Sequence, residues 1–132
     1  MNVHAIDHVN LKIPKNGIDA TTTFYHDVLE FDVENRDRYE AGEKGFFSIR
    51  LTDESVIHLR PVTDFKPPSG NSFDHVAFHI EGSIDDIKAR LTAHDIDIER
   101  ESNPLGATGT APAIYVRDPS GYLLEIKETG DN

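Results

Sequence analysis

Ile6-Asp7-His8-Val9 recurs as Phe73-Asp74-His75-Val76, 67 residues further along the chain. Val56-Ile57-His58-Leu59 lies at the same offset from Leu123-Leu124-Glu125-Ile126. His8 and His58, like His75 and Glu125, are therefore separated by 50 residues within their half of the chain. This register indicates a duplicated unit whose halves carry matching donor side chains. Three imidazoles and one carboxylate are a donor set that suits a divalent transition metal.

The composition restricts the class of protein. The chain has 132 residues, 37% of them hydrophobic, and no cysteine, which excludes disulfides, thiolate ligands and a cysteine nucleophile. No segment approaches the run of about 18 apolar residues that a membrane-spanning helix needs, and we recognise no signal or transit peptide. We expect a single globular domain, 1–132, in the cytoplasm.

The chain is strongly acidic. Its net charge is −11, with 24 Asp and Glu against 13 Lys and Arg, and this charge would repel nucleic acid. The acids are spread along the whole length, which fits either a solvated acidic surface or adaptation to high salt.

Hydrophobic periodicity predicts the same order of elements in both halves. Alternating apolar residues at 5–13 and 73–81 predict strands, and segments 18–30 and 83–94 predict helices. Three strand-like runs follow each helix, near 31–39, 45–51 and 55–61 in the first half and near 96–101, 112–117 and 122–127 in the second. Each half therefore reads βαβββ, with modules at 1–65 and 72–132 and a Pro-rich linker at 66–71. Residues 103–110 are too rich in glycine and polar residues for regular structure, and we interpret them as a lid or a surface connection.

Strand parity predicts where the donors point. His8 lies on the strand face opposite Val9, Leu11 and Ile13, and His58 and Glu125 alternate with apolar neighbours in the same way. In an α+β fold with helices on the outer face of a curved mixed sheet, all four donors would face the hollow. A slip of one residue would turn every donor toward the helices.

These residues resemble the vicinal oxygen chelate superfamily, which includes glyoxalase I, extradiol dioxygenases and bleomycin resistance proteins. The resemblance covers essentially the whole chain and rests on the paired modules, the Ile6-Asp7-His8-Val9 strand, and residues 24–29 and 114–126. It implies one divalent ion per site (Zn, Ni, Co, Mn or Fe(II)) bound by His8, His58, His75 and Glu125. It also implies a small-molecule substrate that chelates this ion through adjacent oxygens.

Three functions are consistent with this resemblance. We expect a lyase or isomerase in which Glu125 acts as the catalytic base. A ring-cleaving Fe(II) dioxygenase is an alternative, and a non-catalytic small-molecule binder is another. Glyoxalase I carries Glu where this chain has His58, so a symmetric shuttle between two carboxylates is not expected here. We expect a homodimer with two sites and no membrane partner.

Further residues of the same strand parity are predicted to contact substrate: Phe46, Arg50, Arg60, Tyr115 and Arg117. The arginines would bind an anionic group, or alternatively pair with acids at the rim. His79 has the right parity but lies too far along its strand to be a ligand, and we interpret His4, His26 and His94 as surface groups.

Overall fold

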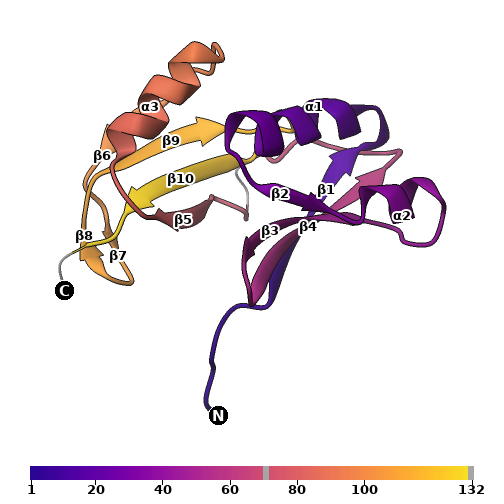
Figure 1. Cartoon of the computed structure of the whole chain (residues 1–132), viewed down its shortest axis with the longest axis horizontal. Coiled ribbons are helices and arrows are strands. Elements are labelled where there is room, and N and C mark those ends of the chain that lie inside the picture. Colours follow the sequence, from indigo (N-terminus) through magenta and orange to yellow (C-terminus); the bar gives the residue numbers. More distant parts are fainter. Residues whose placement is uncertain (70–71, 131–132) are drawn as a thin grey trace. The chain divides into compact units, whose positions relative to one another are not determined.

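A computed structural model describes residues 1–69 and 72–130, and the chain forms two compact units, Met1–Lys66 (unit 1) and Pro67–Asn132 (unit 2). Each unit contains one four-stranded mixed sheet (Figure 1). This confirms the predicted α+β fold of two βαβββ modules. Gly70 and Asn71 of the predicted linker, and Asp131 and Asn132 of the predicted second module, lie outside the described residues.

Unit 1 has the strand order β1-β4-β3-β2, with β1 and β4 parallel and the other pairs antiparallel. Its strands are β1 (His8–Pro14), β2 (Asp32–Glu34), β3 (Phe47–Thr52) and β4 (Ser55–Val62). A short turn, η1 (Lys15–Gly17), leads into α1 (Ile18–Thr22) and the π-helical η2 (Thr23–Val28). The first strand therefore begins three residues later than predicted.

The predicted strand at 31–39 is wrong beyond Glu34, because β2 gives way to the short helix α2 (Arg36–Glu40). Asn35 adopts a left-handed backbone, with φ of 67°, and its carbonyl accepts from Tyr39 N at 2.9 Å. The Arg36 guanidinium binds Glu40 one turn later and Asp19 on α1. These short-range polar contacts stabilise one helical turn.

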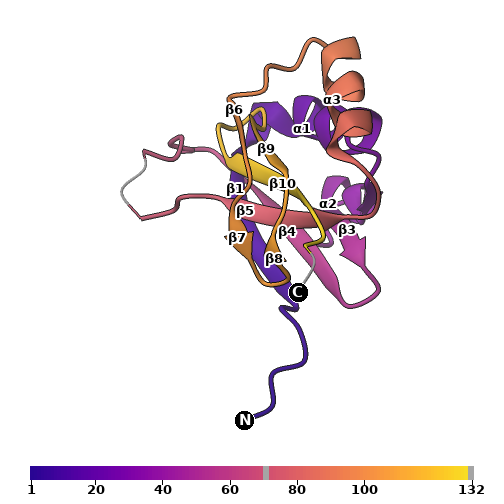
Figure 2. The same ribbon diagram turned by 90° about the vertical axis from the view of Figure 1, so that its left-hand side faces the viewer.

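Unit 2 repeats this arrangement with the order β5-β10-β9-β6. Its strands are β5 (Val76–Ile80), β6 (Arg100–Ser102), β9 (Ala113–Arg117) and β10 (Leu123–Glu128), and its helix is α3 (Ile84–Ala93). Ser83 is the N-cap of α3, because its Oγ accepts from Asp85 N at 3.0 Å. Figures 1 and 2 show α3 on the side of this sheet away from residues 105–110.

The interpretation of 103–110 as irregular is wrong. Residues 105–110 form a two-stranded ribbon, β7 (Leu105–Gly106) with β8 (Gly109–Thr110), in which Leu105 pairs with Thr110. Gly109 has a φ of 97°, so the glycine content serves a tight hairpin turn.

The predicted alternation of buried and more exposed residues is confirmed on β1 and β4, but on β10 every residue from Leu123 to Lys127 is buried. Ile57, Leu59 and Leu124 are fully buried and Ile126 nearly so, whereas His8 and His75 are exposed. Within the described residues, no helix is both long and apolar enough to cross a membrane. His8 and His58 therefore lie on the sheet face opposite the buried residues of β1 and β4, whereas Glu125 is itself buried.

The turn between β9 and β10 is stabilised by one buried carboxylate. Asp118, 4% exposed, accepts at Oδ1 from Ser120 N and Tyr122 N, each at 2.9 Å. Gly121 completes the turn with a φ of 96°, which suits glycine. The turn sets the pairing of β9 with β10, and thus the position of Glu125.

We expect Asp118→Ala to lower the free energy of unfolding by about 2 kcal/mol, because two backbone N–H groups lose their acceptor. Urea unfolding followed by circular dichroism measures this loss. Thr52→Ala is the matched control, since Thr52 Oγ1 accepts from Glu54 N in the exposed turn of unit 1. An equal loss in both variants would contradict the importance of burial.

Candidate metal centre

Unit 1 brings two of the predicted ligands together. The parallel pairing of β1 with β4 places Asn10 opposite His58 and Val56 opposite His8. The ring centroids of His8 and His58 lie 4.5 Å apart, with the rings tilted by 42°. Two imidazoles from different strands therefore share one face of the first sheet.

Unit 2 brings the other two together. His75 directly precedes β5, and Glu125 lies on the neighbouring β10. His75 Nε2 lies 3.2 Å from Glu125 Oε1. Two ligands bound at about 2.1 Å and at right angles to each other would be about 3 Å apart, so this spacing fits neighbouring positions on one ion.

In each unit, a carboxylate binds Nδ1 of the histidine at the start of the first strand. His8 Nδ1 donates to Asp7 Oδ2 at 2.7 Å, and His75 Nδ1 donates to Asp74 Oδ2. Because a carboxylate only accepts, each contact keeps the proton on Nδ1 and leaves the Nε2 lone pair available in the neutral ring. Metal-binding histidines are commonly oriented in this way.

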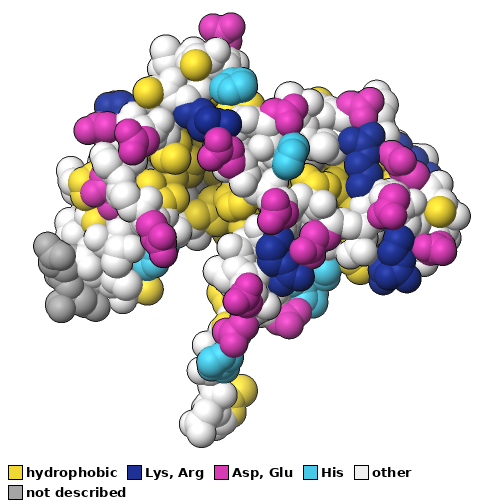
Figure 3. Space-filling view, in the orientation of Figure 1, with side chains coloured by type: hydrophobic (Ala, Val, Ile, Leu, Met, Phe, Trp, Pro, Cys, Tyr) yellow, Lys and Arg dark blue, Asp and Glu magenta, His cyan; other side chains and the backbone are white. Residues whose placement is uncertain are grey.

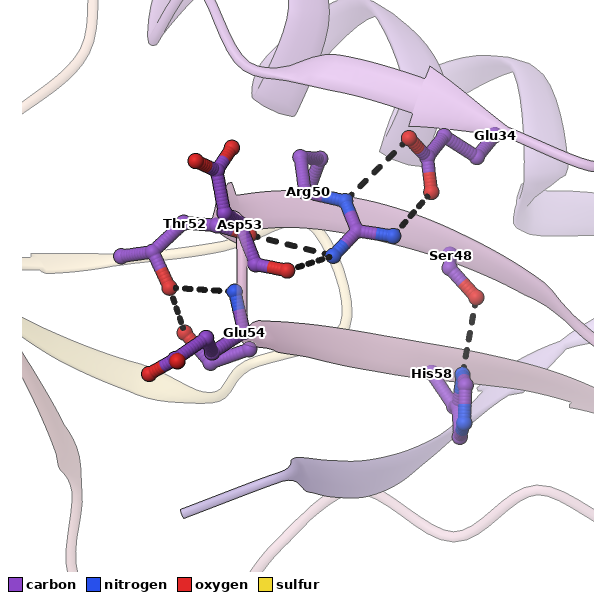
Figure 4. A network of polar contacts seen from close by, with 8 residues as sticks. Glu34, Ser48, Arg50, Thr52, Asp53, Glu54 and His58 are labelled. Carbon is purple, nitrogen blue, oxygen red and sulfur yellow. Dashed lines mark hydrogen bonds and ion pairs between the residues drawn. The ribbon is translucent and has the colours of Figure 1, made fainter. Parts of the chain in front are cut away.

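The third strand of each sheet supplies a second pair of equivalent contacts. Ser48 Oγ and His58 Nδ1 are hydrogen-bonded at 2.8 Å (Figure 4), and Tyr115 Oη donates to Glu125 Oε1 at 2.6 Å. Ser48 and Tyr115 are 67 residues apart, like the ligands that they contact. Ser48 and Tyr115 are buried, 2% and 3% exposed, so each predicted ligand is hydrogen-bonded to a buried side chain.

The charges fit a cation. In neutral His75 the Nε2 lone pair faces the Glu125 carboxylate, and two acceptors at this distance repel each other unless a proton or a metal ion lies between them. Burial, with a smaller contribution from the nearby charge of His8, lowers the pKa of His58. The hydrogen bond from His75 lowers the pKa of Asp74. The lowered pKa values favour the neutral ring of His58 and the ionised carboxylate of Asp74, and neutral imidazoles are the form that binds metal.

The five predicted substrate contacts have different surroundings. Arg50 binds Glu34 through two nitrogens, at 2.9 and 3.2 Å (Figure 4), and Arg117 binds Glu99 at 2.8 Å. Both arginines thus pair with acids, as the alternative interpretation anticipated. Tyr115 contacts Glu125, whereas Phe46 and Arg60 lie beside His58 and contact each other. Their contact with substrate stays a prediction.

Each arginine also lines a cavity next to the carboxylate that orients a histidine. In unit 1 a cavity of about 610 Å³ is lined by Asp7, Arg50 and Val56, among others. In unit 2 a cavity of about 320 Å³ is lined by Asp74, Arg117 and Leu123, among others. These three positions are equivalent in the two halves, so the duplication extends to the space beside each Asp–His pair.

The sequence contained a signal for the orienting groups that our prediction did not use. Asp7 and Asp74 precede their histidines at the same offset, and Ser48 and Tyr115 share it. His4, His26 and His94 are exposed, as expected, and His79 is bonded to Thr108 at 3.3 Å. Among the described residues, no three His, Asp or Glu side chains lie close enough together to hold a metal ion, so the four predicted ligands are found as two pairs.

Comparison with known proteins identifies relatives. Residues 5–126 match the sequence model of the Glyoxalase/Bleomycin resistance protein/Dioxygenase superfamily. The chain is 31% identical to virulence protein STM3117 of Salmonella typhimurium, over 97% of this chain and 86% of the relative. It is 30% identical to a "Probable lactoylglutathione lyase" of Synechocystis, over 85% and 87% of the two chains.

Solved structures share the fold. The crystal structure of the Salmonella protein matches with a TM-score of 0.76 at 26% identity, covering 98% of this chain and all of that one. A glyoxalase/dioxygenase from Nostoc punctiforme matches with a TM-score of 0.77 at 17% identity, covering 98% and 94%. The second match bears on the fold alone.

We expect the His58 imidazole of metal-free protein to titrate below its ordinary pKa of 6.5, because burial disfavours the charged ring. The unfolded chain takes up this proton first as the pH falls. The stability linked to His58 is therefore complete above pH 6.5 and is lost between 6.5 and the lower pKa of the folded state. Imidazole NMR resonances followed against pH measure the shift, and a His58 pKa above 6.5 would contradict it.

Proposed function

Because the chain belongs to the glyoxalase/bleomycin resistance protein/dioxygenase superfamily, we propose that it is a divalent-metal-dependent lyase or isomerase. Its substrate would be a small molecule with two adjacent oxygen atoms. Relatives named "Probable lactoylglutathione lyase", from Synechocystis and from Vibrio cholerae, support this reaction class.

One observation carries the proposal. In unit 2, His75 Nε2 faces Glu125 Oε1 at 3.2 Å while Asp74 occupies the other ring nitrogen. In unit 1, His58 and His8 offer the corresponding pair of imidazoles. We propose that these four side chains bind one divalent ion, Zn, Ni, Co, Mn or Fe(II), contributed by one chain or by two chains of a homodimer.

The bound ion would supply Lewis acidity toward the two substrate oxygens. Glu125 is the group that moves a proton, because the position equivalent to it in unit 1 is His58. Tyr115 donates to Oε1 of this carboxylate. The substrate proton would therefore be taken up at Oε2, while the phenol stabilises the charge on Oε1 between turnovers.

The buried position of Glu125 also affects what happens to the proton that it abstracts. Its side chain is 7% exposed, so bulk water has little access to the carboxylate. A base in this environment keeps an abstracted proton long enough to return it to the substrate, which favours isomerisation over exchange with solvent.

We expect purified protein to bind one divalent ion for each set of four ligands, and His8→Ala, His58→Ala, His75→Ala and Glu125→Ala each to weaken binding at least tenfold. Each variant removes one donor from the set. Elemental analysis and calorimetric titration with zinc measure this effect.

His94→Ala is the matched control for these variants, since His94 is exposed at the C-terminal end of α3. Equal binding by the wild type and all four variants would overturn the proposed ligand set.

We expect the metal-loaded protein to isomerise a substrate with adjacent oxygens, without consuming oxygen, and Glu125→Gln to lower kcat by about 100-fold or more. The first substrate to test is the hemithioacetal of methylglyoxal and glutathione, because the relatives are named lactoylglutathione lyases. Thioester formation and an oxygen electrode give the two readouts.

Oxygen consumption coupled to product formation would overturn the proposed lyase or isomerase activity and indicate a dioxygenase instead. Failure to turn over a panel of 2-oxoaldehydes and 2-hydroxyketones, with and without thiol, would favour the binding protein. His94→Ala should retain full activity.

A further inference from the structure

Two cations flank one aromatic ring beside His58. Lys44 Nζ lies 5.8 Å from the Phe46 ring centroid, and the Arg60 guanidinium carbon lies 5.3 Å from it. The centroid of the Phe46 ring is in turn 4.3 Å from that of His58. We call Lys44, Phe46 and Arg60 the Phe46 patch. All three side chains are half-buried, so their charges are partly shielded from solvent and still accessible.

Within the part of the chain that the structure describes, neither cation of the Phe46 patch forms an ion pair. Other arginines of unit 1 do, since Arg36, Arg38 and Arg50 each bind a carboxylate. Two cations held against a ring without a carboxylate therefore offer a site for an external anion.

The equivalent positions in unit 2 show that the duplicated fold does not require this patch. Lys44, Phe46 and Arg60 correspond, 67 residues later, to Ala111, Ala113 and Lys127. All three equivalents are buried.

The cation of unit 2 is also covered by protein. Lys127 is 2% exposed, and its ammonium donates to Gly109 O at 2.9 Å. A Cβ at Gly106 would lie 3.1 Å from Lys127 Cε, so the β7–β8 ribbon packs closely over this side chain. Of the cations at these equivalent positions, Lys44 and Arg60 are accessible and Lys127 is not.

We propose that the Phe46 patch binds an anionic group (a carboxylate, phosphate or phosphonate) of the small molecule that the site takes. The link to the substrate rests on the proposed function, whereas anion binding by the patch does not. The ring of Phe46 would pack against the carbon skeleton next to the anion, and Arg60 would supply a planar pair of donors.

Gly45 gives a way to disturb the patch without changing its charge. A Cβ at this position would lie 2.9 Å from Arg60 Nη1, so Gly45→Ala should displace the guanidinium while both cations remain. No change in fold is expected, because the atom that has to move is the end of a flexible side chain.

The first test uses metal-free protein and phenylphosphonate, followed by heteronuclear NMR. We expect saturable shifts of the Lys44, Gly45, Phe46 and Arg60 resonances, and none at 111–113 or 127. Arg60→Gln and Lys44→Gln should each weaken binding about tenfold, and Gly45→Ala should weaken it less. Arg38→Gln, which removes an exposed cation paired with Glu43, is the matched control and should bind like the wild type.

The neutral diethyl ester of phenylphosphonate separates charge from shape and should not shift these resonances. The proposal is overturned if the patch does not respond, if the ester binds as well, or if Arg38→Gln weakens binding as much as Arg60→Gln. These outcomes do not depend on metal.

The second test links the patch to the substrate site. Zinc-loaded protein is titrated with 3,4-dihydroxybenzoate and with 3,4-dihydroxybenzamide, which share adjacent oxygens and differ in charge. We expect the wild type to prefer the benzoate about tenfold and Arg60→Gln to lose this preference. Equal binding by the wild type would remove the patch from the substrate site. Failure to take up zinc would instead refute the proposed function and leave the first test decisive for the anion.

Discussion

The parallel register of β1 with β4, and of β5 with β10, decides the direction of every donor in this protein. Side chains alternate between the two faces of a strand, so a shift of one residue would exchange His58 with Ile57 and Glu125 with Leu124. Ile57 and Leu124 are fully buried, and exposing them to solvent would cost free energy. Burial of the apolar residues thus fixes the register that orients the donors.

A second constraint acts on the donor atoms themselves. Asp7 and Asp74 hold Nδ1 of the histidine that follows each of them, while Ser48 and Tyr115 hold the ligands on β4 and β10. A rotating side chain would have to lose its freedom on binding an ion, and these hydrogen bonds remove that freedom beforehand. Asp7 and Asp74 also bring negative charge next to the imidazoles of His8 and His75. The surroundings of the proposed ligands thus share the strong acidity of the chain (Figure 3).

The two halves have kept one scaffold and changed its chemistry. Both have an Asp–His pair, a partner on the third strand and a cavity beside an arginine, yet the carboxylate among the four proposed ligands, Glu125, belongs to unit 2. Near His58 the cations stay accessible around Phe46, whereas Lys127 is covered by the β7–β8 ribbon. Because the two halves share one fold, equivalent positions have matching geometry. Substitutions at these positions would then give one half the proposed proton-transferring group and the other the proposed anion-binding group.

The βαβββ order and the buried faces of β1 and β4 followed from the sequence because strand alternation and the 67-residue offset are local or repeated patterns, and the same offset selected the four proposed donors. Other features depended on contacts that no local pattern specifies. Asn35 and the ion pairs of Arg36 converted a predicted strand into α2, Gly109 converted a predicted irregular segment into a hairpin, and the acids next to Arg50 and Arg117 could be identified only in space. The tertiary structure alone decided which polar partner each donor has, because a hydrogen bond depends on the meeting of two side chains far apart in the chain.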